Sequence, residues 1–407
     1  MNILDNTTLS NCTSCGVCAS VCAKVAIDME LDNNGFYRPM INTDLCVDCG
    51  LCTTVCYKYD EDVKMTLSEG LKDKPLYSAW SNDDELVKQT TSGGIGDLLA
   101  HQLLKEGYKV VGVVYNEDKT RAEHRVAEGE EDLYGFRGSK YIQSYTYEAF
   151  KMVVANCQKE KYAVFGTPCQ IYALNKLATK RKVRDNFLFI DLFCHGCPSI
   201  FVWTKYQTRI KKKLGIERFD KVIFRSKTKG WGIFKVEVVV DGKPVIINEK
   251  SNDNFYELFF SDQVLNEACQ DCKLRSTLEY TDIRLGDFWG KKYLNNYKGV
   301  SAISLVTTRG WETFDSIKEK ITLANCDYQD FLPWQSWGKT YSVNTEIRKA
   351  IINSLNNPQE NIVDAIRVLR KKLPFINNIM RLAKCTISFL PLQLINTLKR
   401  IKYSILK

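Results

Sequence analysis

The chain has 407 residues, 44% hydrophobic and 26% charged, a mixture typical of folded globular proteins that excludes disordered and collagen-like architectures. Its length predicts two to three domains. Residues 1–62 carry nine acidic and three basic side chains, a net charge of −6, and residues 361–407 carry one acidic and ten basic, a net charge of +9, which leaves +6 for the middle of the chain. A general nucleic-acid binder is usually basic across a whole face, so we expect no nucleic-acid partner.

Cysteine is the outlying residue type. The chain holds 16 cysteines beside only 3 histidines, and eight of the cysteines lie between Cys12 and Cys56. The first ten residues have neither a basic start nor an apolar stretch, so we expect no signal peptide and a cytoplasmic protein. Thiols stay reduced in that compartment, which favours metal ligation over disulfides. With so few histidines, sulfur must supply most of the ligands.

Two segments near the N-terminus repeat the pattern C-x2-C-x2-C-x3-C. In this spacing three cysteines bind one [4Fe–4S] cluster and the fourth binds the cluster of the other segment. The alternative, a pair of tetrahedral zinc sites, rarely uses a third cysteine packed so closely. The expected ligands of one cluster are Cys12, Cys15, Cys18 and Cys56, and those of the other are Cys46, Cys49, Cys52 and Cys22.

The repeat predicts a two-cluster ferredoxin domain over residues 1–62, whose function is electron transfer. The resemblance to bacterial two-cluster ferredoxins covers residues 8–60, with Ala23 and Tyr57 in place of the proline that usually follows the fourth cysteine. Between the two segments, residues 25–31 and 36–41 are expected to form strands around a turn.

A polar stretch, residues 63–75, is interpreted as a linker, after which helical and strand patterns alternate. A Thr-Ser-Gly-Gly turn at 91–94 precedes a helix expected over 95–106, and apolar runs at 109–115, 163–166 and 187–193 predict buried strands. This order predicts an α/β domain with ligand-binding loops at the carboxyl ends of its strands. The overall fold class expected is therefore α+β and α/β.

Those loops carry a second set of cysteines. Cys169 and Cys194 each follow a predicted strand, and Cys269 and Cys272 form a C-x-x-C pair. Four thiolates suffice for a third [4Fe–4S] cluster, but the spacing is equally compatible with buried cysteines that bind nothing. The remaining cysteines, Cys157, Cys197, Cys326 and Cys385, lack such context and are expected to be packing residues.

Six separated motifs follow one another along the chain: TSGG at 91–94, GSKYIQS at 138–144, GTPCQ at 166–170, DLFCHGCPS at 191–199, the C-x-x-C at 269–272 and DIRLGDFWG at 282–290. In this order they resemble the coenzyme F420 hydrogenase/dehydrogenase beta-subunit family. The resemblance runs from about residue 76 to 310 and implies a bound FAD, an adjacent [4Fe–4S] cluster and two-electron exchange with a deazaflavin or another unsaturated acceptor.

Carried over position by position, the resemblance makes Cys169, Cys194, Cys269 and Cys272 the ligands of the third cluster, with Cys197 the main competitor. It implies a flavin-binding region over 76–180 and the family's C-terminal region over 181–350. The flavin contacts would be Thr91, Ser92, Gly93, Gly94, Gly138, Ser139, Lys140 and Tyr141.

Reduction of a carbon–carbon or carbon–oxygen bond would need a proton donor in addition to the flavin. The candidates are His195, Tyr141 and Asp287, and the alternative for His195 is a structural loop histidine. The chain contains no G-x-G-x-x-G turn, which disfavours direct binding of NAD(P).

Residues 351–407 form a basic amphipathic tail. Apolar residues recur at helical spacing from 362 to 373, and a second helix is expected over 393–406. The longest uncharged stretch, 385–398, is too short to span a bilayer. Such a tail can lie on the inner face of an anionic membrane, or pack on its own domain or on a partner subunit.

Together these patterns predict an FAD- and [4Fe–4S]-dependent oxidoreductase that moves electrons between ferredoxin-type clusters and a two-electron substrate. The alternative is an electron-transfer subunit of a larger dehydrogenase or hydrogenase complex with no substrate of its own. Expected partners are a small-molecule hydride donor or acceptor, and a redox protein such as a ferredoxin or a hydrogenase or dehydrogenase subunit; a homo-oligomer is a further expectation.

Overall fold

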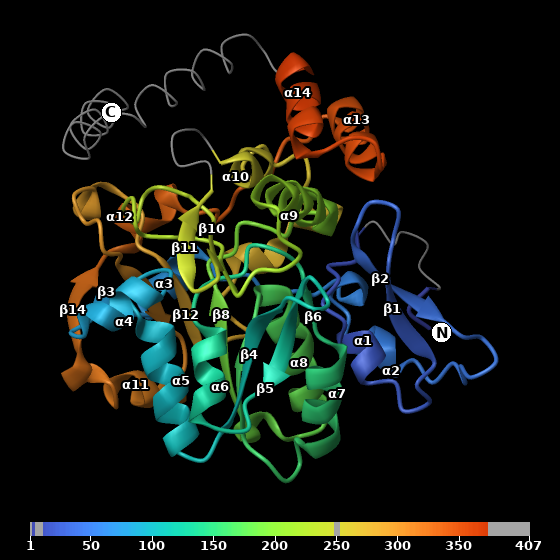
Figure 1. The fold of residues 1–407 in the computed structure, drawn as a ribbon. Helices are drawn as coiled ribbons and strands as arrows, with labels where there is room; N and C mark the ends of the chain where they lie inside the picture. Colours follow the sequence, from blue (N-terminus) through green and yellow to red (C-terminus); the bar gives the residue numbers. More distant parts are fainter. Residues whose placement is uncertain (1, 5–10, 248–252, 373–407) are drawn as a thin grey trace.

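The computed structural model describes residues 2–4, 11–247 and 253–372. A small domain built on the N-terminal cysteine repeat lies against one side of a much larger layered body (Figure 1). Cys385 and the helix expected over 393–406 lie outside the described residues.

The small domain contains the expected hairpin and two single-turn helices, each of which includes the third cysteine of its motif. Helices α1 (Val17–Ser20) and α2 (Leu51–Thr54) each follow a glycine in the left-handed conformation, at φ 75° and 74°. Strands β1 (Ile27–Leu31) and β2 (Tyr37–Ile41) pair antiparallel around the expected turn. The local pattern therefore fixed this domain, because both motifs and the turn act over a few residues.

The segment 63–75 is docked on the large body and is not the free linker that its polarity predicted. It contains a short helix, α3 (Ser68–Lys72), and buries Val63 and Leu71. The hydroxyl of Thr66 donates a hydrogen bond to Glu279 at 2.8 Å and accepts one from the Leu278 N–H at 2.8 Å. Two widely spaced apolar residues are too weak a periodic signal to reveal such docking in advance.

Within the described residues, nine strands form one mixed sheet in the order β14-β3-β13-β12-β8-β7-β4-β5-β6. Its centre, β12-β8-β7-β4, is parallel, whereas β14, β3 and β13 add antiparallel strands at one side. Strands β7 and β8 pair directly, so the sheet is continuous across residue 180. The bounds are β3 Leu76–Ser81, β4 Lys109–Asn116, β5 Arg121–Val126, β6 Ser144–Tyr145, β7 Tyr162–Phe165, β8 Phe187–Leu192, β12 Ile283–Asp287, β13 Ser301–Leu305 and β14 Ile321–Cys326.

Helices cover both faces of this sheet. On one face Leu99 and Leu103 of α5 pack with Val110, and on the other Phe150 of α7 packs with Val111. Successive side chains of β4 point to opposite faces of the sheet, and helices cover both faces. Both sets of side chains are therefore buried, which is why the run at 109–115 is continuously apolar. The helices on the sheet are α4 Asp84–Gln89, α5 Ile95–Lys105, α6 Glu130–Phe136, α7 Tyr147–Asn156, α8 Pro168–Lys180, α11 Thr308–Asp315 and α12 Tyr328–Phe331.

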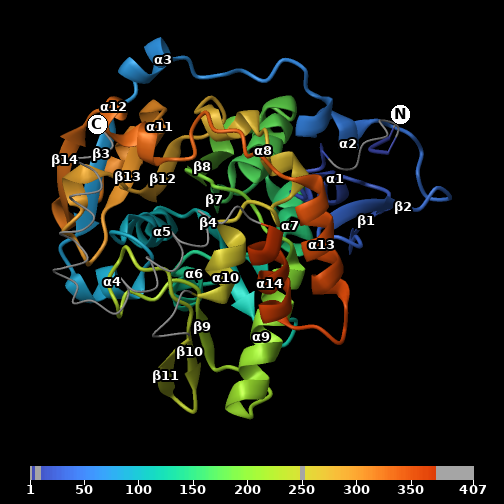
Figure 2. The ribbon, with the colours of Figure 1, turned by 90° about the horizontal axis from the view of Figure 1, so that it is seen from above.

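A further layer, beyond one end of the sheet, combines a three-stranded sheet with four helices around a second core (Figure 2). The predicted helix at 362–373 is α14, and it buries Ile366 and Leu369 in this core. That helix therefore packs on its own chain. The elements are β9 Lys221–Ile223, β10 Glu237–Val240, β11 Lys243–Ile246, α9 Ile200–Leu214, α10 Asn254–Phe259, α13 Thr345–Asn356 and α14 Ile362–Lys372.

In the part of the chain that the structure describes, no helix combines the length and apolar character needed to cross a bilayer.

The tip of the β1–β2 hairpin contacts the start of α9. The Ile200 N–H donates to the carbonyl of Gly35 at 3.0 Å, and a Cβ on Gly35 would overlap Ser199 Oγ and come within 2.9 Å of the Phe201 ring. Gly35 also has a φ of +77°, so both backbone conformation and space require glycine there.

Replacing this glycine should destabilise the junction between the two parts. Gly107 is a matched control, because its φ is +83° but a Cβ there meets nothing within 4 Å. We expect G107A to lower the free energy of unfolding by about 1 kcal/mol through left-handed strain alone. G35A should cost about 1–3 kcal/mol more, through overpacking. Urea unfolding followed by circular dichroism measures both, and equal losses would contradict the junction.

Candidate functional site

The four cysteines expected to hold the first cluster line one cavity. Its empty volume, including the part open to solvent, is about 460 Å³. Cys56 comes from the second motif and meets three cysteines of the first, which is the crossed arrangement that the spacing predicts. Cys12, Cys15, Cys18 and Cys56 share the cavity wall with Ile3, Met29, Pro39 and Val55, among others.

The electrostatics of this cavity suit a cationic core. Burial raises the pKa of Cys18 well above its usual range, and the charges of Cys15, Cys12 and Cys56 raise it further. Burial, followed by the charges of Cys15 and Cys12, raises the pKa of Cys56 to about 12. Four thiolates this close repel one another in a dry environment unless positive charge lies between them. The donor set therefore fits an iron–sulfur cluster.

The cysteines expected to hold the second cluster include one that is exposed at the surface of the small domain. Cys22 and Cys52 pack in one apolar cluster with Cys18 and Cys56, whereas Cys49 is exposed on the loop before α2. Cys22 Sγ also accepts a hydrogen bond from the Ala26 N–H at 3.3 Å.

Three separate segments bring the four cysteines of the third set together. Burial raises the pKa of Cys169, as do the nearby charges of Cys15, Cys272 and Cys194. Burial and then the charges of Cys194 and Cys272 raise the pKa of Cys269 to about 12. Cys169 begins α8, Cys194 follows β8, and Cys269 and Cys272 flank a turn beside the 3-10 helix Lys273–Ser276. The four cysteines predicted as one ligand set are thus neighbours.

Cys197 lies beside only part of this set. Burial raises its pKa, and the charges that add to the effect come from Cys269 and Cys194. Cys157 is fully buried among the apolar residues of α7 and the sheet, as a packing residue should be. Cys326 lies on β14, where its sulfur is 3.2 Å from Lys292 Nζ.

Among the described residues, no three His, Cys, Asp or Glu side chains form a group that could hold a single metal ion.

The first and third sets adjoin each other. Cys15 packs in the same apolar cluster as Cys169 and Cys272. Tyr57, which follows Cys56, accepts a hydrogen bond from the Lys273 N–H at 3.1 Å. Burial, and next the charge of Cys272, raises the pKa of Tyr57 to about 12. The three sets thus form a series in which the Cys12 set stands between the other two.

Side chains of the large body hold the backbone of the first ligand loop. The Thr146 hydroxyl donates a hydrogen bond to the carbonyl of Cys15 at 2.9 Å. The side-chain amide of the fully buried Asn266 donates one to the carbonyl of Cys12 at 3.1 Å. A Cβ on Gly16 would overlap the hydroxyl of Thr146. The small domain is therefore seated in one orientation.

The two predicted flavin-binding segments touch. The Ser139 N–H donates to Thr91 Oγ1 at 2.7 Å. The Gly93 N–H donates to Ser301 Oγ at 2.9 Å, and the Ser92 hydroxyl donates to the carbonyl of Val300 at 2.8 Å. Two of the turn's polar groups therefore fasten it to β13, a role that only the sheet order reveals.

Lys140 points its ammonium at its own loop. Nζ donates to the carbonyl of Gly135 at 2.9 Å and to that of Arg137 at 3.1 Å. Burial, and to a smaller degree the charge of Lys221, lowers its pKa to about 7. Gly138, two residues earlier, has a φ of +78° and turns the chain at this point.

Two of the three proposed proton donors meet at a buried arginine. Arg225 donates to the hydroxyl of Tyr141 at 3.3 Å and to the carboxylate of Asp287. The indole of Trp231 donates to the same carboxylate at 3.0 Å. Burial raises the pKa of Tyr141, so its hydroxyl keeps its proton.

His195 is not in direct contact with this group. Its Nε2 lies 2.9 Å from Asp262, and its Nδ1 lies 3.1 Å from Ser336 Oγ. The rings of His195 and Tyr141 pack on Phe259, at 5.2 Å and 5.6 Å between centroids. His195 thus lies across Phe259 from Tyr141.

Beside Arg225 lies an aromatic cavity that the sequence patterns did not reveal. Its empty volume, including the part open to solvent, is about 1090 Å³, and none of its lining side chains is charged. Trp231 and Trp289 stack at 4.6 Å between centroids, and the Arg225 guanidinium lies 4.8 Å from the centroid of Trp289. The signal available was the run Gly230-Trp231-Gly232. The aromatic lining is Trp231, Phe234, Phe260, Phe288, Trp289, Tyr293, Tyr297 and Trp334.

Comparison with known families gives three matches along the chain. Residues 11–58 match the 4Fe-4S dicluster domain. Residues 76–151 match "Coenzyme F420 hydrogenase/dehydrogenase, beta subunit N-term", and residues 159–330 match the C terminus of the beta subunit in the same family.

Among individual proteins, the chain is 26% identical over 266 residues to the coenzyme F420 hydrogenase subunit beta of Methanococcus voltae, covering 61% of this chain and 88% of that one. Among solved structures, a chain of the F420-reducing [NiFe] hydrogenase complex from Methanosarcina barkeri, in a xenon-derivatised form, superposes with a TM-score of 0.44. It is 20% identical, and the match covers 61% of this chain and 81% of that one.

A buried ion pair supports the loop of the third set. Arg284 and Asp191 are each about 2% exposed, and Arg284 Nε donates to Asp191 at 2.8 Å. Arg284 also donates to the carbonyl of Arg275 at 3.2 Å, just beyond Cys272. This guanidinium therefore joins β8, β12 and the cysteine loop.

Removing the carboxylate should leave Arg284 buried without a counter-charge. We expect D191N to lower the free energy of unfolding by about 3–5 kcal/mol. The control is D185N, because Asp185 pairs with Arg309 while its own side chain is 95% exposed, and its loss should change little. Urea unfolding of both variants measures the difference, and a D191N protein as stable as D185N would refute the role given to the pair.

Proposed function

Since the chain belongs to the coenzyme F420 hydrogenase/dehydrogenase beta-subunit family and carries an N-terminal 4Fe-4S dicluster domain, we propose that it is an iron–sulfur flavoprotein oxidoreductase. It would move electrons between three [4Fe–4S] clusters and a small two-electron substrate. The observation that carries this proposal is the nearness of the first and third sets: Cys15, Cys169 and Cys272 pack against the same apolar cluster, and the charge of Cys15 adds to burial in raising the pKa of Cys169.

Each cysteine set has a separate task in this proposal. The sets of Cys12 and Cys46 would hold the two clusters of the dicluster domain, crossed through Cys56 and Cys22. Cys169, Cys194, Cys269 and Cys272 would hold the third. Thr146 and Asn266 support the series by fixing the backbone of the Cys12 loop, so the domain stays where its cluster adjoins the third set.

A bound flavin would exchange single electrons with clusters and electron pairs with substrate, which no cluster does alone. The touching segments around Thr91 and Ser139 are the proposed flavin contacts, with Lys140 close by. The flavin type proposed is FAD, as the family resemblance implies.

The chain's own residues would orient the substrate and control its protons. The stacked Trp231 and Trp289 present flat apolar surfaces to the aromatic cavity, on which a planar substrate would stack. Tyr141, protonated and held by Arg225, is the proposed proton donor. Asp287 is engaged by Arg225 and Trp231, so we propose that it positions both side chains.

A second candidate function is an electron-transfer subunit within a larger hydrogenase or dehydrogenase complex. The relative from Methanococcus voltae, named as a hydrogenase subunit, favours it. The two functions differ in whether the isolated chain, once loaded with its cofactors, oxidises or reduces a small molecule such as coenzyme F420.

Anaerobic purification should yield about 12 iron and 12 sulfide per chain, with one flavin. C169S should lower both values to about 8, because the third cluster loses a ligand while the other two remain. The matched control is C157S, which removes a fully buried sulfur outside the three sets and should keep about 12. Chemical iron and sulfide analysis with flavin absorption measures each variant.

Other results would overturn particular parts of the proposal. An iron content of about 8 per chain in the wild-type protein would contradict the proposed third cluster. A full iron content without flavin would contradict the proposed reaction with a two-electron substrate. A colourless protein that contains zinc would contradict the redox function altogether.

A further inference from the structure

The outer end of the dicluster domain carries a concentration of exposed apolar side chains. Thirteen large hydrophobic residues are exposed among the described residues, and five of them fall between residues 25 and 47. Exposed apolar groups gathered in this way mark interaction sites more often than scattered ones. Four of them, defined here as the outer patch, are Val25, Met40, Leu45 and Val47, with exposed fractions of 45, 48, 48 and 60%.

The members of the outer patch belong to adjoining segments. The Asn42 N–H donates to the carbonyl of Ala26 at 2.9 Å, which places Val25 beside the start of the loop 42–50. That loop carries Leu45 and Val47. Figures 1 and 2 both show it projecting from the far side of the small domain, away from the nine-stranded sheet.

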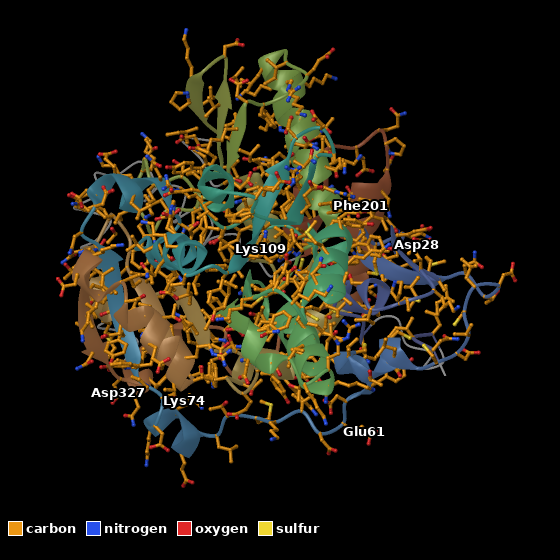
Figure 3. The ribbon with its side chains drawn as sticks, turned by 90° about the horizontal axis from the view of Figure 1, so that it is seen from below. Asp28, Glu61, Lys74, Lys109, Phe201 and Asp327 are labelled. Atoms are coloured by element: carbon orange, nitrogen blue, oxygen red, sulfur yellow. The ribbon has the colours of Figure 1, made fainter. Side chains whose placement is uncertain are left out.

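Carboxylates surround the patch. Asp28 lies directly opposite Met40 in the hairpin and, with Glu30, Asp44 and Asp48, is exposed. Asp28 lies at the surface of the small domain (Figure 3). Within the described part of the chain, no ion pair involves Asp28, Glu30 or Asp44. The patch therefore combines an apolar centre with a negative rim.

The outer patch is also the end of the cysteine series that another protein can reach. The loop 42–50 itself carries Cys46 and the exposed Cys49. The Cys12 set lines a cavity walled by residues of the small domain, and its members, like those of the third set, are buried or only partly exposed. A macromolecular electron donor or acceptor therefore comes nearest to the series at this loop.

We propose that the outer patch is the docking surface for a redox protein whose cofactor edge is apolar and ringed by lysine and arginine. This inference rests on the redox function proposed above. Each encounter passes one electron, so that the clusters lose one electron and the partner's cofactor gains it, or the reverse, with no proton transferred. Four exposed carboxylates outnumber the one exposed lysine next to the patch, Lys24. Charge complementarity therefore selects a basic partner over an acidic ferredoxin.

The test uses the full-length, iron-loaded chain with a basic c-type cytochrome as the probe. The chain is photoreduced and mixed with the ferric cytochrome, and stopped-flow absorbance follows one-electron reduction of the haem. We expect a second-order rate that falls steeply with salt, and a much slower rate with an acidic flavodoxin. Reversing charge in the variant D28K/D44K should lower the cytochrome rate about tenfold at low salt and flatten its salt dependence.

The control makes the same change in net charge elsewhere. Glu312 and Glu319 lie in and beyond α11, on the opposite side of the molecule from the small domain (Figure 1), and both are exposed. The variant E312K/E319K should keep a rate within about twofold of the wild type, since steering acts over about 10 Å at physiological salt. Equal slowing by both variants, or by neither, would overturn the docking surface.

A binding readout accompanies the kinetics. Carbodiimide joins carboxylates to the lysines of bound cytochrome, so wild type and control should yield cross-linked peptides containing Asp28, Asp44 or Asp48. Cross-links elsewhere would refute the proposal.

Iron analysis verifies that each variant keeps its clusters. If the double variant loses iron, the single variant D28K replaces it, because Asp28 is farther along the chain from the cysteines than Asp44 is. Iron-free wild type would instead refute the redox function, whereas iron-loaded wild type that reduces neither probe refutes only this surface.

Discussion

The structure depends on the gathering of sulfur in places from which water is largely excluded. Buried thiolates repel one another, so a group such as Cys12, Cys15, Cys18 and Cys56 is stable together only as protonated thiols or around positive charge. Burial and mutual charge raise the pKa of Cys18 and Cys56 in the same direction. The third set, around Cys169, obeys the same constraint in the large body.

Because two such sets adjoin, the dicluster domain has to keep one orientation. Thr146 and Asn266 bind the carbonyls of the Cys12 loop, and Gly16 and Gly35 allow backbone to approach where a Cβ would not fit. The docked segment 63–75 extends this attachment over the large body. These contacts give the chain two unlike ends: an exposed acidic loop at one, and an uncharged aromatic cavity beside Arg225 at the other.

The difference between these two ends keeps the proposed one-electron transfer to a protein apart from the proposed two-electron reaction of a small molecule. Transfer of a single electron needs only a short distance between the two redox cofactors, so the loop 42–50 can be exposed to water and charged. Hydride or proton transfer to a small molecule needs a site that holds and orients it, and the stacked Trp231 and Trp289 offer flat apolar surfaces for this. Belonging to the coenzyme F420 hydrogenase/dehydrogenase beta-subunit family leaves the substrate open, since one scaffold serves several reactions.

Sequence alone determined the features that act over a few residues: the two cysteine motifs, the hairpin between them, the strand at 109–116 and the helix α14. Each depends on spacing along the chain. Tertiary structure alone decided which distant residues meet. Sheet order brought Cys169, Cys194, Cys269 and Cys272 together, tied Gly93 to Ser301, and separated His195 from Tyr141 and Asp287. The aromatic cavity could not be foreseen, because its walls come from loops whose meeting depends on strand pairing that no local pattern encodes.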